Sequence, residues 1–123
     1  MQQPLAIVFY ERLMPGSQLV NRLQDMNYRV RAVHNLVDLA DKVYRDAPML
    51  VIADLATQGD VCGVIEKIKT DPTTAHVPII SFAPDNRMHL LTAAQKAQSN
   101  QSVIESALLN HLQSILEQAL QLE

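Results

Sequence analysis

The chain has 123 residues, of which 48% are hydrophobic and 19% charged, and it carries a formal net charge of −3. This composition is typical of a globular domain that buries its own core, and it excludes a disordered or fibrous protein. The small negative charge offers no basic patch for nucleic acid or an anionic membrane, and a single cysteine, Cys62, excludes an internal disulfide. We therefore expect one cytoplasmic domain over residues 1–123, with no signal peptide or membrane-spanning segment.

Short apolar runs rich in valine and isoleucine recur along the chain. Runs without polar alternation are typical of strands that are buried on both faces of a parallel sheet. Four such runs, and a weaker fifth that we expect at an edge of the sheet, are Leu5–Phe9, Val30–Val33, Met49–Ala53, Val77–Phe82 and Ser102–Ile104.

Segments with helical periodicity separate these runs. The first predicted helix begins at Ser17, after a Pro15–Gly16 loop, and the second is capped by Asn35. A third predicted helix begins at Val61. Two more are predicted over residues 88–97 and 108–122, the last as one continuous helix. Five alternations of strand and helix predict an α/β fold with a doubly wound parallel sheet and right-handed crossovers.

The third run ends on a carboxylate, Asp54, and a loop that contains Gly59 follows. In doubly wound sheets, ligands bind beyond the carboxyl ends of the strands. Asp54 therefore either delivers a carboxylate to a site at this edge or caps the following loop.

Four longer segments together resemble one family in their order and spacing, and they cover nearly the whole chain. They are NYRVRAVHNLVDLADKV, APMLVIADL, IEKIKTDPTTAHVPIISFA and AQSNQSVIESALLNHLQSIL. The family is the response-regulator receiver domains of the CheY-like superfamily. The resemblance implies a flavodoxin-like sheet with five parallel strands in the order 2-1-3-4-5, and it makes Asp54 the phospho-acceptor position.

The family also holds Mg²⁺ with an acidic pair that follows the first strand. The matching positions here are Tyr10 and Glu11, or in another register Phe9 and Tyr10, so this segment offers at most one carboxylate, Glu11, as a metal ligand. Arg12 is adjacent, and its guanidinium is a candidate charge substitute that would neutralise Asp54 if it turned inward.

Three further positions of the family's switch are altered in this chain. Ala83 stands where the family has a serine or threonine, Ser102 where it has an aromatic residue, and Glu105 where it has a lysine. Gln98 stands where a glycine precedes the fifth strand. Phosphoryl transfer depends on positive charge around the transferred oxygens, so Glu105 reverses the charge that the chemistry needs.

The resemblance implies a stand-alone receiver-like domain of a bacterial two-component or phosphorelay system. The altered positions favour a degenerate receiver, a pseudo-receiver, that acts by protein–protein contact without the usual phosphorylation switch. The alternative is a phospho-accepting response regulator that uses Asp54 in an atypical pocket, and only this alternative requires Mg²⁺. No nucleophile–base pair or phosphate-binding loop supports an enzyme. Expected partners are a histidine kinase or a downstream signalling protein, or a second copy through the face of the fourth helix, fifth strand and fifth helix.

Overall fold

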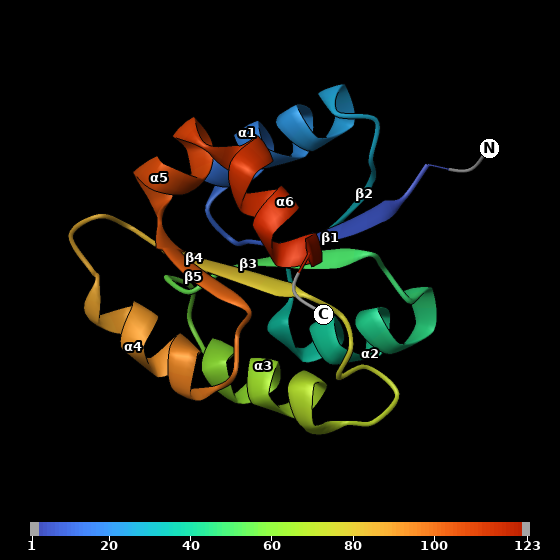
Figure 1. The fold of residues 1–123 in the computed structure, drawn as a ribbon. Helices are drawn as coiled ribbons and strands as arrows, with labels where there is room; N and C mark the ends of the chain where they lie inside the picture. The colour runs from blue at the N-terminus through green and yellow to red at the C-terminus, as the bar shows by residue number, and fades with distance from the viewer. Residues whose placement is uncertain (1–2, 122–123) are drawn as a thin grey trace.

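The computed structural model describes residues 3–121 as a single sheet with helices on both sides (Figure 1). The strands are β1 (Leu5–Phe9), β2 (Arg29–Val33), β3 (Leu50–Asp54), β4 (Ile79–Ala83) and β5 (Gln101–Ile104). The helices are α1 (Leu13–Asp25), α2 (Leu36–Asp46), α3 (Val61–Thr70), α4 (His89–Lys96), α5 (Glu105–Asn110) and α6 (Leu112–Gln121).

The sheet is parallel throughout, with its strands in the order β2-β1-β3-β4-β5. This order confirms the predicted fold. Most residues of the three central predicted strands have no exposed surface, among them Ile7, Val8, Val51, Ile52, Ile79 and Ile80. The fifth strand lies at the edge, as its weak apolar content predicts, and its residues are only half-buried.

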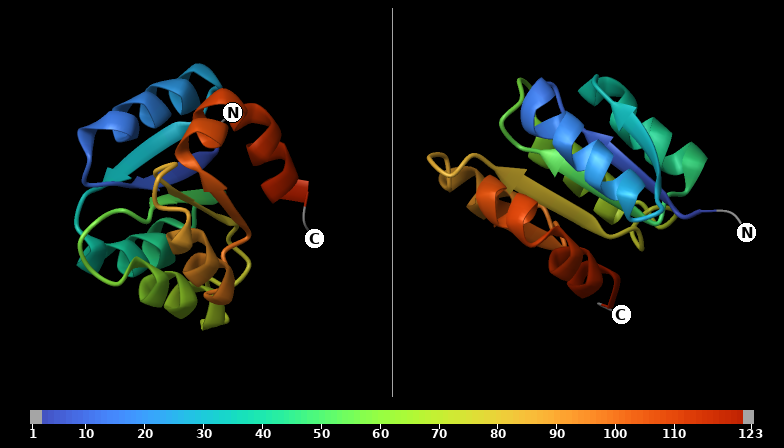
Figure 2. Two further views of the ribbon diagram at one scale, coloured as in Figure 1. Left: turned by 90° about the vertical axis from the view of Figure 1, so that its left-hand side faces the viewer. Right: turned by 90° about the horizontal axis from the view of Figure 1, so that it is seen from above.

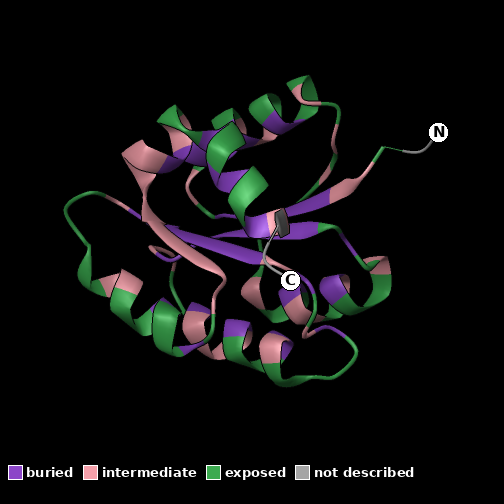
Figure 3. Ribbon diagram, in the orientation of Figure 1, coloured by how far each residue is buried: buried purple, intermediate pink, exposed green. Residues whose placement is uncertain are grey.

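Two apolar layers enclose the sheet, and successive residues of a strand point into opposite layers. On one face, α2, α3 and α4 cover a core that includes Ile7 and Val51. On the other, α1, α5 and α6 cover a core that includes Val8 and Ile52. Figure 2 shows the two helical layers from other directions, and Figure 3 shows that the central strands and the inner faces of the helices are buried. Most residues of the outer strand β2 are exposed or half-buried, so the expectation that this strand is buried on both faces is wrong.

The first helix begins earlier than predicted. It starts at Leu13, interrupted by a non-helical Met14, and Pro15 and Gly16 are buried residues of the helix and not a loop. The backbone N–H groups in the first turn of a helix have no partner within the helix, so proline, which lacks this group, fits there. A Pro-Gly pair at this position therefore does not require a loop. Gly16 also makes room for an aromatic ring, because a Cβ atom built on it would overlap the ring of Tyr10.

The last predicted helix is two helices. The backbone leaves the helical conformation at His111, with φ −130° and ψ 34°, and this residue separates α5 from α6. Arg22 on α1 donates a hydrogen bond of 2.8 Å from Nη1 to the carbonyl oxygen of Leu109, near the end of α5. The break keeps leucines of both helices, Leu108 and Leu112, in the same core.

Candidate functional site

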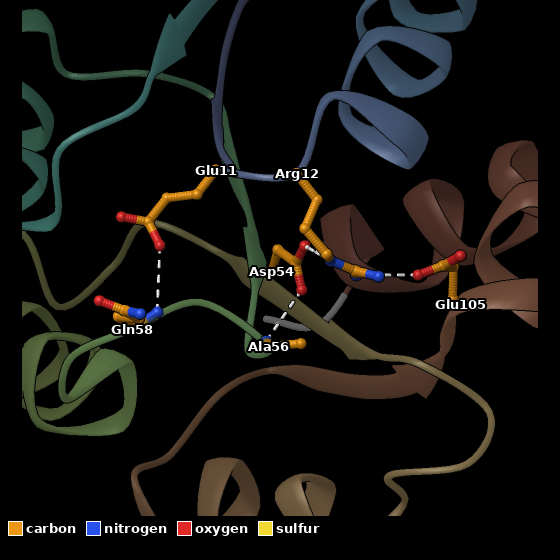
Figure 4. Close-up of polar contacts among 6 residues, drawn as sticks. All are labelled: Glu11, Arg12, Asp54, Ala56, Gln58 and Glu105. Atoms are coloured by element: carbon orange, nitrogen blue, oxygen red, sulfur yellow. Dashed lines mark hydrogen bonds and ion pairs between the residues drawn. The ribbon is translucent and has the colours of Figure 1, made fainter.

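Asp54 lies at the carboxyl edge of the sheet as the last residue of β3, one residue beyond the predicted end of that strand. Its side chain is 0% exposed. The backbone N–H of Ala56 donates to Oδ1 of Asp54 at 2.9 Å, so the chain that turns away from the strand binds one carboxylate oxygen (Figure 4). Asp54 therefore delivers a carboxylate to this edge and also caps the following loop.

Arg12, in the loop between β1 and α1, turns towards Asp54. Its Nε and Nη2 atoms lie 2.8 Å and 2.7 Å from Oδ2 of Asp54. The same Nη2 atom lies 2.9 Å from Oε1 of Glu105, the first residue of α5. The structure thus brings together the predicted acceptor position, the predicted charge substitute and the position that replaces the family's lysine, from three separate segments (Figure 4).

Burial is the largest influence on the carboxyl group of Asp54, and it raises its pKa above the ordinary value because charge is disfavoured away from water. The hydrogen bond from Ala56 and the hydrogen bond and charge of Arg12 act in the opposite direction but do not cancel the effect of burial. The charge of Glu105 makes a smaller contribution that also raises the pKa. Burial, and not repulsion by the like charge of Glu105, is therefore the main cause of the raised pKa of Asp54.

The guanidinium of Arg12 is also partly desolvated. This desolvation is the largest single influence on its pKa, and it acts to lower it. Hydrogen bonds and charge interactions with Asp54 and Glu105 together outweigh this effect and raise the pKa above its ordinary value. Arg12 is therefore a permanent cation between two carboxylates.

The residues at this edge do not fit a Mg²⁺ ion, which prefers six oxygen ligands in an octahedron. Glu11 is exposed, and its Oε1 atom accepts a hydrogen bond of 3.0 Å from the backbone N–H of Gln58 instead of meeting Asp54 (Figure 4). Both oxygens of Asp54 already accept hydrogen bonds from Ala56 and Arg12. Over residues 3–121, no three histidine, cysteine, aspartate or glutamate side chains come close enough to hold a metal.

Tyr10, the other residue aligned with the family's acidic pair, belongs to the core. Its ring lies against Gly16 and meets the ring of His34 edge-on, with the centroids 4.7 Å apart. The Nδ1 atom of His34 lies 3.1 Å from the carbonyl oxygen of Tyr10. Tyr10 therefore has a structural position beside the site and offers no carboxylate to it.

The remaining two altered positions lie on β4 and β5. Ala83 ends β4, fully buried, and contributes no hydroxyl group. Ser102 on β5 joins a chain of hydroxyl groups: Oγ of Ser81 lies 3.0 Å from Oγ of Ser102 and 2.8 Å from Oγ of Ser99. Small hydroxyl side chains, which hold the two strands together, thus occupy the place of the family's aromatic residue.

One contact at this edge has no sequence signal that would identify it in advance. Asp85, in the loop after β4, accepts hydrogen bonds from the N–H of Ser106 at 3.1 Å and from its Oγ at 2.5 Å. These bonds lower the pKa of the Asp85 carboxyl group. The start of α5 is therefore held twice, by Asp85 through Ser106 and by Arg12 through Glu105.

No protein-family model matches the chain, and no curated protein matches it. Solved structures do match. A structure described as a response regulator from Chloroflexus aurantiacus has a TM-score of 0.87 and 17% identity, covering 96% of this chain and 98% of that one. The chemotaxis response regulator CheY4 of Vibrio cholerae has a TM-score of 0.82 and 10% identity, covering 95% and 98%.

A third similar structure is the receiver domain of the sensor histidine kinase PA1611 from Pseudomonas aeruginosa, with a magnesium ion coordinated in its active-site cleft. Its TM-score is 0.85 at 16% identity, covering 96% of this chain and 98% of that one. The chain therefore has the CheY-like fold of response-regulator receiver domains. Among the helices that the structure describes, none is long and apolar enough to cross a membrane.

Proposed function

We propose that this chain is a receiver-like domain of a bacterial two-component or phosphorelay system, and that it acts through protein contact without the usual phosphorylation switch. The receiver fold supports the class of protein. The position of Arg12 supports the degenerate mechanism, because its guanidinium binds the oxygen of Asp54 that Ala56 leaves free and links it to Glu105.

Phosphoryl transfer to a carboxylate requires an accessible oxygen and positive charge around the transferred group. Asp54 is fully buried, and its Oδ2 atom already accepts the Nε–H group of Arg12 and forms an ion pair with Nη2 of the same residue. An incoming phosphoryl group would have to displace Arg12, and it would then meet the negative charge of Glu105 nearby. These features disfavour phosphorylation of Asp54.

The alternative is a phospho-accepting response regulator in which Asp54 receives a phosphoryl group from a histidine kinase. One observation favours it: Arg12 already supplies a cation beside Asp54, and arginine binds phosphoryl oxygens well. In that case Arg12 would move from the carboxylate of Asp54 to the new phosphoryl group.

A small-molecule phosphodonor such as acetyl phosphate, applied with and without Mg²⁺, separates the two mechanisms by intact mass. We expect no phosphoryl adduct in either condition. An adduct that the parent chain forms and the Asp54→Asn variant does not form would establish the alternative. A receiver domain with a complete acidic pair, treated in parallel, verifies that the donor is active.

We further propose that the chain is cytoplasmic, is not an enzyme and needs no cofactor. Its partner would be a histidine kinase or a downstream signalling protein. A homodimer through the face of α4, β5 and α5 is a further candidate contact. Size-exclusion chromatography with light scattering at increasing concentration tests the homodimer, and a single monomeric mass throughout would contradict it.

A further inference from the structure

Helices α2 and α3 lie side by side on one face of the sheet (Figure 1). Residues of both helices line a groove between their exposed sides. The groove consists of two adjoining cavities of about 500 Å³ and about 210 Å³. Val37, on the first turn of α2, lines both cavities and so joins them into one surface. This surface, called the α2–α3 groove below, is separate from the Arg12–Asp54–Glu105 cluster.

Two large apolar side chains of α2 are exposed along this groove. Val37 is 85% exposed and Tyr44 is 58% exposed. The core-facing residues of the same helix, Leu39 and Val43, are fully buried, so the core does not use Val37 or Tyr44. Seven residues separate the two, which places them about 10 Å apart along the helix axis.

The groove also carries an excess of negative charge. Four acids and one base line the two cavities: Glu11, Asp41, Asp60, Asp71 and Lys67. Glu11, Asp60 and Asp71 are exposed, and one carboxylate oxygen of each accepts a hydrogen bond from a backbone N–H at 2.9 to 3.0 Å. Asp41 contacts Arg45 at 3.4 Å, but both side chains are about two-thirds exposed, so this ion pair contributes little.

We propose that the α2–α3 groove binds a basic amphipathic helix of a partner protein, with apolar side chains of that helix packed against Val37 and Tyr44. The inference deepens the proposed function, on which it rests, because it names a contact surface and the chemistry of the partner. It places the partner on a different surface from the face of α4, β5 and α5.

The spacing and the charges favour a helix over other shapes of ligand. Apolar residues two turns apart on a partner helix repeat at a distance that matches the separation of Val37 and Tyr44. Lysine or arginine side chains beside that apolar stripe would reach carboxylates at both ends of the groove, at Glu11 and Asp60 on one side and at Asp71 on the other.

The test is an NMR titration of the ¹⁵N-labelled full chain with a synthetic peptide. The probe is a helix of about 14 residues with leucines at i, i+3, i+4 and i+7 and lysines beside them. We expect saturable shifts at amide groups of α2 and α3. The double variant Val37→Ser, Tyr44→Ser should weaken binding about tenfold or more, as for truncation of anchor residues at an interface. Both side chains are exposed, so the fold should tolerate the change.

The matched control is Met88→Ser, since Met88 is 59% exposed at the start of α4, away from the groove. It should bind the peptide as the parent does. Three results would overturn the inference: no saturable binding, equal binding by the groove variant, or equal binding of a peptide with glutamate in place of lysine. Shifts confined to α4, β5 and α5 would overturn it too. The titration uses no phosphodonor, so its outcome is independent of the mass test of Asp54.

Discussion

Asp54 divides its two carboxylate oxygens between the backbone and a side chain. Oδ1 accepts the N–H of Ala56, and Oδ2 accepts the guanidinium of Arg12, which in turn binds Glu105. Removal of one partner of a buried ion pair is costly, because it leaves a desolvated charge without compensation. The stability of the chain should therefore depend on Arg12, on the charge of Asp54 and on pH.

The substitution Arg12→Ala should lower the free energy of unfolding by about 2 kcal/mol near neutral pH, because it leaves Asp54 buried and uncompensated. Without Arg12 the pKa of Asp54 rises further, so the loss should shrink in acid as Asp54 becomes protonated. Urea unfolding followed by circular dichroism at neutral and acidic pH measures both effects.

The same substitution in an Asp54→Asn background is the control for this prediction. With no charge at position 54, Arg12→Ala should cost clearly less than it does in the parent chain. Equal losses in the two backgrounds, or an unchanged melting temperature at both pH values, would show that Arg12 does not neutralise Asp54.

Asp54→Asn alone should leave the free energy of unfolding at neutral pH unchanged or raise it. The folded-state pKa of Asp54 lies above its ordinary value of 3.8, so the folded chain binds more protons than the unfolded chain between these two values. The contribution of Asp54 to the free energy of unfolding therefore falls as the pH rises from the ordinary pKa to the folded-state pKa. The Asp54→Asn variant has no titrating group at this position and so lacks this pH dependence. A melting temperature measured across acidic pH should fall less with rising pH in the variant than in the parent.

The sequence predicts which residues reach this edge but not how their side chains are arranged. Asp54 could be placed because an apolar strand ends on it. The inward turn of Arg12 depends on the extended backbone of that residue, with φ −81° and ψ 123°, and nothing in the sequence fixes it. Glu11, a candidate metal ligand only through the resemblance to the family's acidic pair, accepts a hydrogen bond from the backbone N–H of Gln58.

At the scale of the elements, the strands were predicted to within one or two residues and the helices less well. The third helix ends before Asp71, as predicted, and Asn35 caps α2 through a hydrogen bond to the N–H of Val37. The break at His111 was missed because leucines continue at helical spacing on both sides of it. The spacing of apolar residues indicates which face of a helix is buried. A short break that keeps the same face buried does not change this spacing, so it cannot be predicted from it.

One strained residue precedes β5. Gln98 adopts a left-handed conformation with φ 73°, at the position where receiver domains have a glycine. Glutamine pays a steric penalty there that glycine does not. We expect Gln98→Gly to raise the free energy of unfolding by about 0.5 to 1 kcal/mol, measured by urea unfolding.

The control for this substitution is Asn27→Gly, at a second left-handed residue with φ 68°. Asparagine tolerates this conformation better than most residues, so the change should have little effect. A loss of stability in Gln98→Gly would indicate that the glutamine side chain contributes more than the backbone strain costs.

At the scale of the whole molecule, the parallel, doubly wound sheet could be predicted because the central strands are apolar on both faces and helices alternate with them, whereas the strand order followed from the resemblance to receiver domains. The α2–α3 groove could not be predicted from the sequence, because it depends on how the two helices lie against each other. Residues such as Val37 and Tyr44 read as ordinary members of an amphipathic helix until their exposure is known.

Millimolar Mg²⁺ should leave the melting temperature of the parent chain unchanged. A ligand that binds only the folded state raises the melting temperature once its concentration exceeds its dissociation constant, and the edge around Asp54 offers no set of oxygen ligands for the ion. Calcium chloride at the same concentration controls for ionic strength. A rise specific to Mg²⁺, lost in Asp54→Asn, would contradict this prediction.

The bond between Arg12 and Glu105 joins positions that lie 93 residues apart in the chain. Closing a loop of this length costs chain entropy, so we expect this contact to form late in folding and to be lost early in unfolding. Loss of an interaction absent from the transition state accelerates unfolding and hardly changes folding. We therefore expect the loss of the contact between Arg12 and Glu105 to shorten the lifetime of the native state more than it slows folding.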